Sequence, residues 1–129
     1  MWVTMMKLMT LTDMHRFKEL LVWQFSKGLA VEIFQITQQF PKSALYSIGD
    51  QIRKSSLCIP SNIAEGAGRS SNQQFAYFLN VALGSAYELE TQLLIAAELA
   101  YGPQQSFEKC MNDLKEVQNM LIGLRRSLA

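Results

Sequence analysis

The sequence is poor in the residues that build most catalytic and metal sites. It has one histidine, His15, and two cysteines, Cys58 and Cys110, which lie far apart in the chain. No CxxC pair or Cys/His group indicates a zinc or redox site, and no Glu-x-x-His motif indicates a di-metal bundle. Two cysteines in apolar surroundings are typical of a reduced protein. We therefore expect no metal, cofactor, small-molecule substrate or enzymatic activity.

Charge is also scarce. Charged residues make up 18% of the chain, and 12 basic against 11 acidic residues give a formal net charge of +1. Strong nucleic-acid binders usually show a basic excess, which this composition lacks as a whole. Hydrophobic residues reach 49%. A small domain with so few charges has difficulty covering itself with polar surface, which favours self-association.

Long apolar runs are missing as well. No stretch approaches the roughly 18 uninterrupted apolar residues of a membrane span. Residues 1–9 are apolar and rich in Met but contain Lys7, and they lack the layout of a signal peptide. We expect a cytoplasmic protein with no membrane partner.

Proline occurs three times, and two of these residues separate long periodic segments. Helical periodicity extends over residues 12 or 13 to 39, from after Pro41 to 64, from 71 or 72 to 100, and, after Pro103, from 104 to 128. The third segment is the clearest, because two of its apolar rows step by seven and alternate large with small residues. Those rows comprise Phe75, Ala82, Leu89, Ala96, and Leu79, Ala86, Leu93, Ala100. Four helices with short connections predict an all-α, antiparallel up-down four-helix bundle.

Local signals refine the helix ends. Thr12 or Asp13, Ser43, and Ser71 or Asn72 are candidate N-caps of the first three helices. Pro60 falls inside the second periodic segment and predicts a kink or short break near residues 57–59. We expect the side chains of Ser61 and Asn62 to satisfy backbone groups freed there. Gly66 and Gly68 are expected to end this helix, so GAGRSS at 66–71 is interpreted as a turn and cap rather than a phosphate loop.

Several stretches occur together in an unusual combination. They are VWQ at 22–24, FP at 40–41, QIRK at 51–54, IPSNIAEG at 59–66 and GSAYELETQL at 84–93. From residue 17 to the C-terminus, the chain resembles the bacterial four-helix-bundle family named after the intervening sequence of large-subunit ribosomal RNA genes. The residues that carry its central motif are Pro60, Ser61, Asn62, Glu65 and Gly66.

The resemblance implies a four-helix bundle that assembles into a homopentameric barrel. It also implies kinship with the accessory protein of diversity-generating retroelements, a basic adaptor for nucleic acid and a reverse transcriptase. The net charge of +1 departs from that adaptor. Because family members begin near residue 15, we predict that residues 1–13 form a poorly packed extension and that residues 14–129 form the bundle domain.

Two groups of residues are candidates for interactions. Arg53 shares a helix face with isoleucines, so we expect it to pair with Glu88 or Glu90, in one subunit or across an interface; the alternative is that all three are ordinary surface charges. The apolar residues off the main stripe of the first helix, Leu21, Trp23, Phe25 and Phe34, and the small-residue face of the third are expected to form subunit interfaces.

These observations favour a non-enzymatic oligomeric scaffold that binds a macromolecular partner. The alternative is an accessory protein that binds nucleic acid, for a reverse transcriptase or structured RNA. Its candidate contacts are Arg16, Lys18, Lys27, Arg53, Lys54, Arg69, Arg125 and Arg126.

Overall fold

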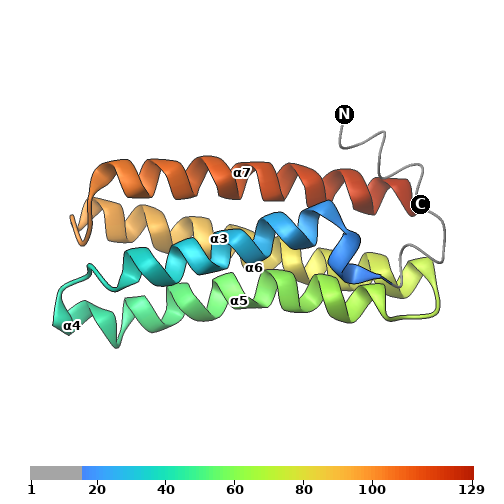
Figure 1. Ribbon diagram of the computed structural model, residues 1–129, viewed down its shortest axis with the longest axis horizontal. Helices are drawn as coiled ribbons and strands as arrows, with labels where there is room; N and C mark the ends of the chain where they lie inside the picture. The colour runs from blue at the N-terminus through green and yellow to red at the C-terminus, as the bar shows by residue number, and fades with distance from the viewer. Residues whose placement is uncertain (1–15) are drawn as a thin grey trace.

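The computed structural model describes residues 16–129, and in that range every regular element is a helix. A 3₁₀ helix, η1 (Phe17–Glu19), precedes the α-helices α3 (Leu21–Thr37), α4 (Lys42–Leu45), α5 (Ile48–Ala67), α6 (Asn72–Glu98) and α7 (Gln104–Ser127). The four long helices lie side by side and alternate in direction (Figure 1). The prediction of an all-helical bundle is confirmed. The extension predicted for residues 1–13 lies outside the described range.

The order of the helices around the bundle follows the chain. The helix α5 packs against α3 and α6, and α7 packs against α6 and α3, so α3 and α6 lie diagonally opposite each other. Both rows predicted for the third helix are buried in the shared core as far as Ala96. Most of this core is aliphatic, with Phe75 and Phe107 among its largest members.

The first long helix starts later than the periodicity predicts. Leu20 has extended backbone (ψ 124°), which separates η1 from α3, so the expected continuous helix from residue 12 or 13 is wrong over 16–20. The interruption buries Leu20 completely and brings the ring of Phe17 edge-on to Trp23, with 5.1 Å between ring centroids. Gln24 Nε2 also donates to the Lys18 carbonyl at 2.8 Å. Burial of Leu20 and partial burial of Phe17 therefore replace the missing helical turn.

The second predicted helix is divided, but not at Pro60. The chain leaves helical geometry at Tyr46 and Ser47, between α4 and α5. The predicted cap Ser43 lies inside α4 and instead provides a carbonyl that accepts a bond from Ser47 Oγ at 3.2 Å. The helix α5 continues through Pro60 to Ala67, so the expected break near 57–59 is absent; a bend of the axis there stays a prediction.

The two ends of α6 differ in how they are capped. Ser71 is the N-cap, as predicted, and its Oγ accepts a bond from the Gln74 N–H at 3.1 Å. At the other end the chain reverses through Ala100, which has a left-handed φ of 55°. The Tyr101 N–H then bonds to the Ala96 carbonyl at 3.1 Å. This is the arrangement that glycine usually provides after a helix.

Candidate functional site

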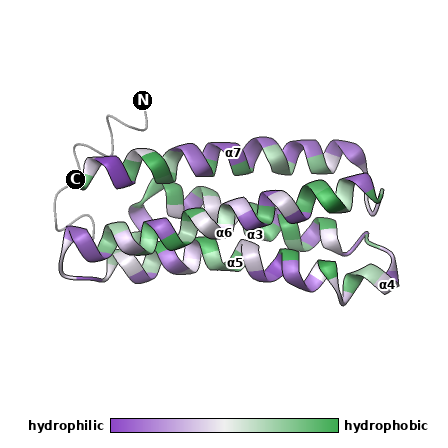
Figure 2. Cartoon of the chain, turned by 180° about the vertical axis from the view of Figure 1, so that it is seen from behind, coloured by the Kyte–Doolittle hydropathy of each residue, from purple (hydrophilic) through white to green (hydrophobic). Residues whose placement is uncertain are grey.

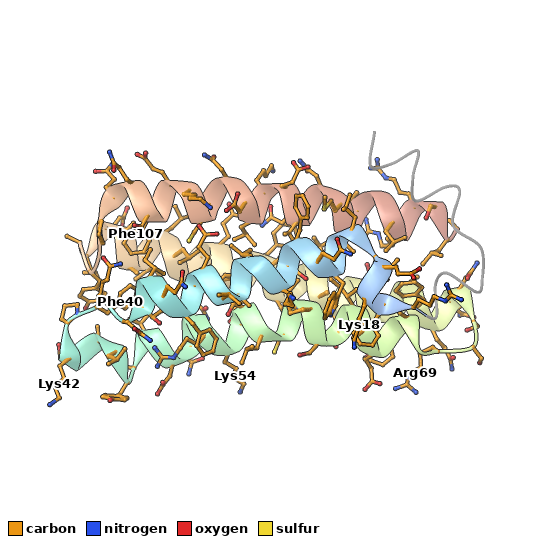
Figure 3. All side chains as sticks on the ribbon, viewed as in Figure 1. Lys18, Phe40, Lys42, Lys54, Arg69 and Phe107 are labelled. Carbon is orange, nitrogen blue, oxygen red and sulfur yellow. The ribbon has the colours of Figure 1, made fainter. Side chains whose placement is uncertain are left out.

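Five of the eight predicted basic contacts gather at one end of the bundle. Figure 1 places η1, the turn between α5 and α6 and the C-terminus together at that end, and Figure 3 shows Lys18 and Arg69 there. Beside these five, the described side chains of this end include two carboxylates, those of Glu19 and Glu65. The five residues, called the basic end from here on, are Arg16, Lys18, Arg69, Arg125 and Arg126.

Some residues of the basic end already have partners in the chain. Arg16 lies 3.6 Å from Glu19, and Arg69 lies 3.5 Å from Glu65. Arg125 donates to Asn80 Oδ1 at 2.7 Å, which ties α7 to α6. Because both ion pairs are solvent-exposed, they are worth little and leave the guanidinium groups accessible to another anion.

The other three predicted basic contacts lie elsewhere. Lys54 is exposed on the middle of α5 (Figure 3), and Lys27 lies over the Trp23 ring with its Nζ 5.3 Å from the centroid. Arg53 is mostly buried, with 17% of its side chain exposed. These three residues therefore do not extend the basic end as one surface.

Arg53 does not pair with Glu88 or Glu90 within the chain. Its guanidinium binds Asp50, one helical turn earlier, and donates to the Leu45 carbonyl at 2.8 Å. The predicted carboxylates bond instead to neighbouring helices: Ser55 Oγ donates to Glu88 at 2.8 Å and Gln118 Nε2 donates to Glu90 at 2.8 Å. The intramolecular pairing is thus wrong, because Asp50 is nearer and each carboxylate has a local donor. Pairing across an interface stays a prediction.

The central motif builds the contact between α5 and α6. Gly66 is buried where a Cβ would stand 2.7 Å from Phe78 Cβ, so only glycine allows this approach of the two helices. Pro60 is buried, Ser61 is exposed, and Asn62 Nδ2 donates to the Cys58 carbonyl at 2.7 Å. The carbonyl that Pro60 leaves without its helical donor is that of Ser56, so the expected satisfaction of a freed group by Ser61 or Asn62 stays a prediction. The motif contributes to the packing of α5 against α6.

One polar cluster escaped prediction from the sequence. Lys109 Nζ lies 3.0 Å from a carboxylate oxygen of Glu32 on α3 and 3.0 Å from one of Asp113 on α7. The hydrogen bond to Asp113 raises the pKa of Lys109 most, and the hydrogen bond to Glu32 has the next largest effect. The pKa of the adjacent Cys110 thiol is raised to about 12, chiefly by burial and secondly by the negative charge of Glu32. The i,i+4 spacing of Lys109 and Asp113 is visible in the sequence, but the approach of Glu32 requires the fold. A neutral, buried thiol is a poor nucleophile.

Both diagonal helices carry a second row of residues outside their fully buried faces; on α3, Leu21 in this row still packs on the core and Glu32 reaches Lys109 of α7. In each row the residues are spaced alternately by four and three, as in a helix that packs on another helix. On α3 the row is Leu21, Phe25, Gly28, Glu32 and Gln35, and on α6 it is Tyr77, Val81, Gly84, Glu88, Thr91 and Ile95. We call these the α3 outer row and the α6 outer row. Figure 2 shows hydrophobic segments recurring along α3 and α6, whereas the visible side of α7 is mainly hydrophilic.

The outer rows expose large apolar groups. Phe25 is 47% exposed on α3, and Tyr77 and Ile95 are 62% and 46% exposed on α6. At Gly28 and Gly84 an added Cβ would meet nothing within 4 Å. No contact within the described chain therefore accounts for either glycine.

A groove of about 700 Å³ lies where α6 ends and α7 begins, at the end opposite the basic end. Its lining is mainly apolar, and it includes the carboxylates of Glu98 and Glu108. Within the described residues, no group of three or more potential metal ligands occurs and no helix is long and apolar enough to cross a membrane.

Comparison with known proteins identifies the family. The family model of the 23S rRNA-intervening sequence protein matches residues 18–123. The chain belongs to this family. The predicted resemblance is thereby confirmed, over nearly the span on which it was based.

A solved relative supports the fold of this 23S rRNA-intervening sequence family member. It is a protein of unknown function from the S23 ribosomal protein family of Bacteroides thetaiotaomicron VPI-5482, with a TM-score of 0.72 and 27% sequence identity. The match covers 81% of this chain and 95% of the relative. No curated protein matches the chain in sequence.

Proposed function

We propose that this protein is a non-enzymatic scaffold that assembles into a ring of identical copies, five as the family resemblance implies, and presents the ring to a macromolecular partner. The observation that carries the proposal is the pair of outer rows on diagonally opposite helices. Because α3 and α6 face away from each other, the α3 outer row of one copy can meet the α6 outer row of the next. A contact between two different faces generates a closed ring when the rotation closes.

The glycines of the outer rows support the same arrangement. A glycine inside a helix destabilises it by roughly 0.5–1 kcal/mol relative to alanine. Gly28 and Gly84 are exposed, and the space beside them is open in the described chain. Close approach by a helix of a neighbouring copy gives both residues a role that the single chain does not.

Light scattering of the purified full chain tests the assembly. The expected mass is about five times the 14.6 kDa of one chain. Phe25→Glu and Ile95→Glu each place a charge on one outer row without touching the core, and each alone should yield monomers. Their mixture should yield a 1:1 dimer, because one variant keeps its α3 outer row and the other its α6 outer row. A wild-type monomer at micromolar concentration contradicts the proposal, as does failure of the mixture to pair.

Substitutions of the two glycines should have opposite effects on the stability of the monomer and on assembly. Gly28→Ala and Gly84→Ala should raise the unfolding free energy of the monomeric background by up to about 1 kcal/mol, because alanine favours helix. In the wild-type background the same changes should weaken assembly. Ala97→Gly, on α6 outside the outer row, is the control that should lower stability and leave assembly unchanged.

A second candidate function is nucleic-acid binding in the manner of an accessory protein for a reverse transcriptase or structured RNA. The basic end favours it, because the net charge of +1 conceals a separation of charge along the bundle. In a ring whose subunits share one direction, the basic ends of all copies would lie on the same side.

Salt dependence separates this candidate from a purely structural scaffold. RNA binding through the basic end should weaken steeply with salt, and the Arg125→Ala/Arg126→Ala variant should reduce the slope of log affinity against log salt. Lys42→Ala, at the opposite end, is the control and should leave the slope unchanged. Absence of binding at 50 mM salt or below would eliminate the candidate.

A further inference from the structure

The groove between α6 and α7 combines an apolar floor with unneutralised carboxylates. Leu94 and Ala97 of α6 and Phe107 and Met111 of α7 supply most of the apolar lining. Leu94 is 51% exposed, whereas Phe107 is buried and packs on Phe40 with ring centroids 6.1 Å apart. The floor is therefore fixed by the core, while Leu94 is available for contact. The volume of about 700 Å³ suits one or two large apolar side chains.

The carboxylates of Glu98 and Glu108 line the same groove, and neither forms an ion pair with a described residue. Glu108 Oε1 accepts only a 3.3 Å hydrogen bond from Gln104. Glu98 is the last residue of α6, and the last turn of that helix contains no basic residue. A carboxylate at a helix C-terminus adds to the negative end of the helix dipole, where a cation is favoured instead.

Two basic residues near this end are engaged elsewhere. Arg53 binds Asp50, and Lys109 is shared between Glu32 and Asp113. Lys42 lies on α4 at the outer tip of the bundle (Figure 3) and forms no ion pair with a described residue. The negative charge on the groove is thus left for a group from outside the chain.

We propose that this groove binds a cationic amphipathic peptide segment of a partner protein, with an apolar side chain seated between Leu94 and Met111 and lysine or arginine residues beside Glu98 and Glu108. The apolar lining provides affinity, and the two carboxylates select for positive charge. The thioether of Met111 adapts to anchors of different shape. Every lining residue belongs to one chain, so the site goes beyond the ring and does not depend on it.

Fluorescence anisotropy with a labelled peptide tests the site on the full chain. The probe is a 12-residue helical peptide of leucine, alanine and lysine, and its counterpart has glutamate in place of lysine. The lysine peptide should bind at least tenfold more tightly than the glutamate peptide at low salt. Ala97→Trp should fill the groove from an exposed position and abolish binding of the lysine peptide.

A matched charge control decides whether binding is local. Glu98→Gln/Glu108→Gln should weaken the lysine peptide at least fivefold. Glu19→Gln/Glu65→Gln removes the same net charge at the basic end and should leave the affinity unchanged. Equal binding of the two peptides, or equal losses in the two double variants, would overturn the proposal. Because the readout is peptide affinity, a monomeric protein that binds the peptide would contradict the ring and support the groove.

Discussion

At one end of α6 the chain turns through residues 68–71, and at the other it turns through residues 99–103. The first turn follows a close helix contact at Gly66 and ends in a serine cap. The second contains an alanine in left-handed geometry and borders an open groove. The residues of the first turn therefore allow α5 and α6 to pack closely. The second turn keeps a strained backbone at Ala100 and lies beside a groove. Stability alone does not explain the second turn, and three substitutions and one labelling experiment test the difference.

The largest effect is expected at Gly66. Gly66→Ala should lower the free energy of unfolding by about 2–3 kcal/mol, because the new Cβ would overlap Phe78 Cβ and Phe75 Cδ1 and force α5 and α6 apart. Urea denaturation measures the loss. Gly68→Ala is the control two residues on, where a Cβ meets nothing nearer than 3.6 Å and the change should be near neutral. Equal effects of the two changes would contradict the close-contact account.

The serine cap should rank next. Ser71→Ala removes the oxygen that accepts from the Gln74 N–H and should destabilise the protein by about 1 kcal/mol. Ser71→Asp should retain most of the stability, since aspartate also caps helices. Thermal unfolding of both variants against Ser70→Ala, which alters the exposed neighbouring residue, measures the contribution of the cap.

At the other turn, a substitution should stabilise. Ala100→Gly should raise the free energy of unfolding by about 0.5–1 kcal/mol, because glycine adopts a φ of 55° without the penalty of a Cβ. Ala97→Gly, within the helix, should lower stability by about 1 kcal/mol. If both substitutions destabilise the protein, the strain at Ala100 is smaller than its geometry implies.

The smallest effect concerns the buried thiol of Cys110, which lies beside Glu32 near the start of α7. Cys110 is buried and its pKa is raised to about 12, whereas Cys58 is partly exposed. A thiol reagent at pH 8 should label Cys58 first and Cys110 only on unfolding. Because the folded-state pKa of Cys110 exceeds its unfolded value near 8.5, its contribution to stability is complete below that pH and is lost as pH rises toward 12. Rapid labelling of Cys110 at pH 8 would mean that this end opens readily.

Much of the fold could be predicted because apolar residues recur at helical spacing and Ser71 precedes a long periodic segment. The irregular points could not. Leu20 leaves the helix because its extended backbone brings Phe17 to Trp23, and that exchange depends on tertiary burial. The division at Tyr46 and Ser47 is followed by Gly49, where a Cβ would stand 3.1 Å from the Ala44 carbonyl, but a single glycine there does not predict a break. Pro60, which does predict one, lies within a continuous helix.

The candidate surfaces were predictable to different degrees. The off-stripe residue Phe25 is exposed, as expected of an interface residue, whereas the small-residue face of the third helix, also expected at an interface, is buried in the core of the chain itself. The partner of Arg53 was misjudged because a carboxylate one turn away competes with one on another helix. The basic end and the groove arise only when the antiparallel helices bring distant residues to the same level. A net charge near zero gives no indication of this separation.

The circular order of the helices also determines how the chain reaches its final form. Each pair of consecutive long helices can form a hairpin through contacts close in sequence, and such local contacts favour fast folding. Among the packed pairs of long helices, the pair of α3 and α7 joins the first helix of the chain to the last, through residues such as Glu32 and Lys109. Forming that contact brings together residues separated by the longest chain segment, which carries the largest entropic cost, so it should be the late step of folding. Substitutions at Glu32 or Lys109 should therefore accelerate unfolding more than they slow refolding.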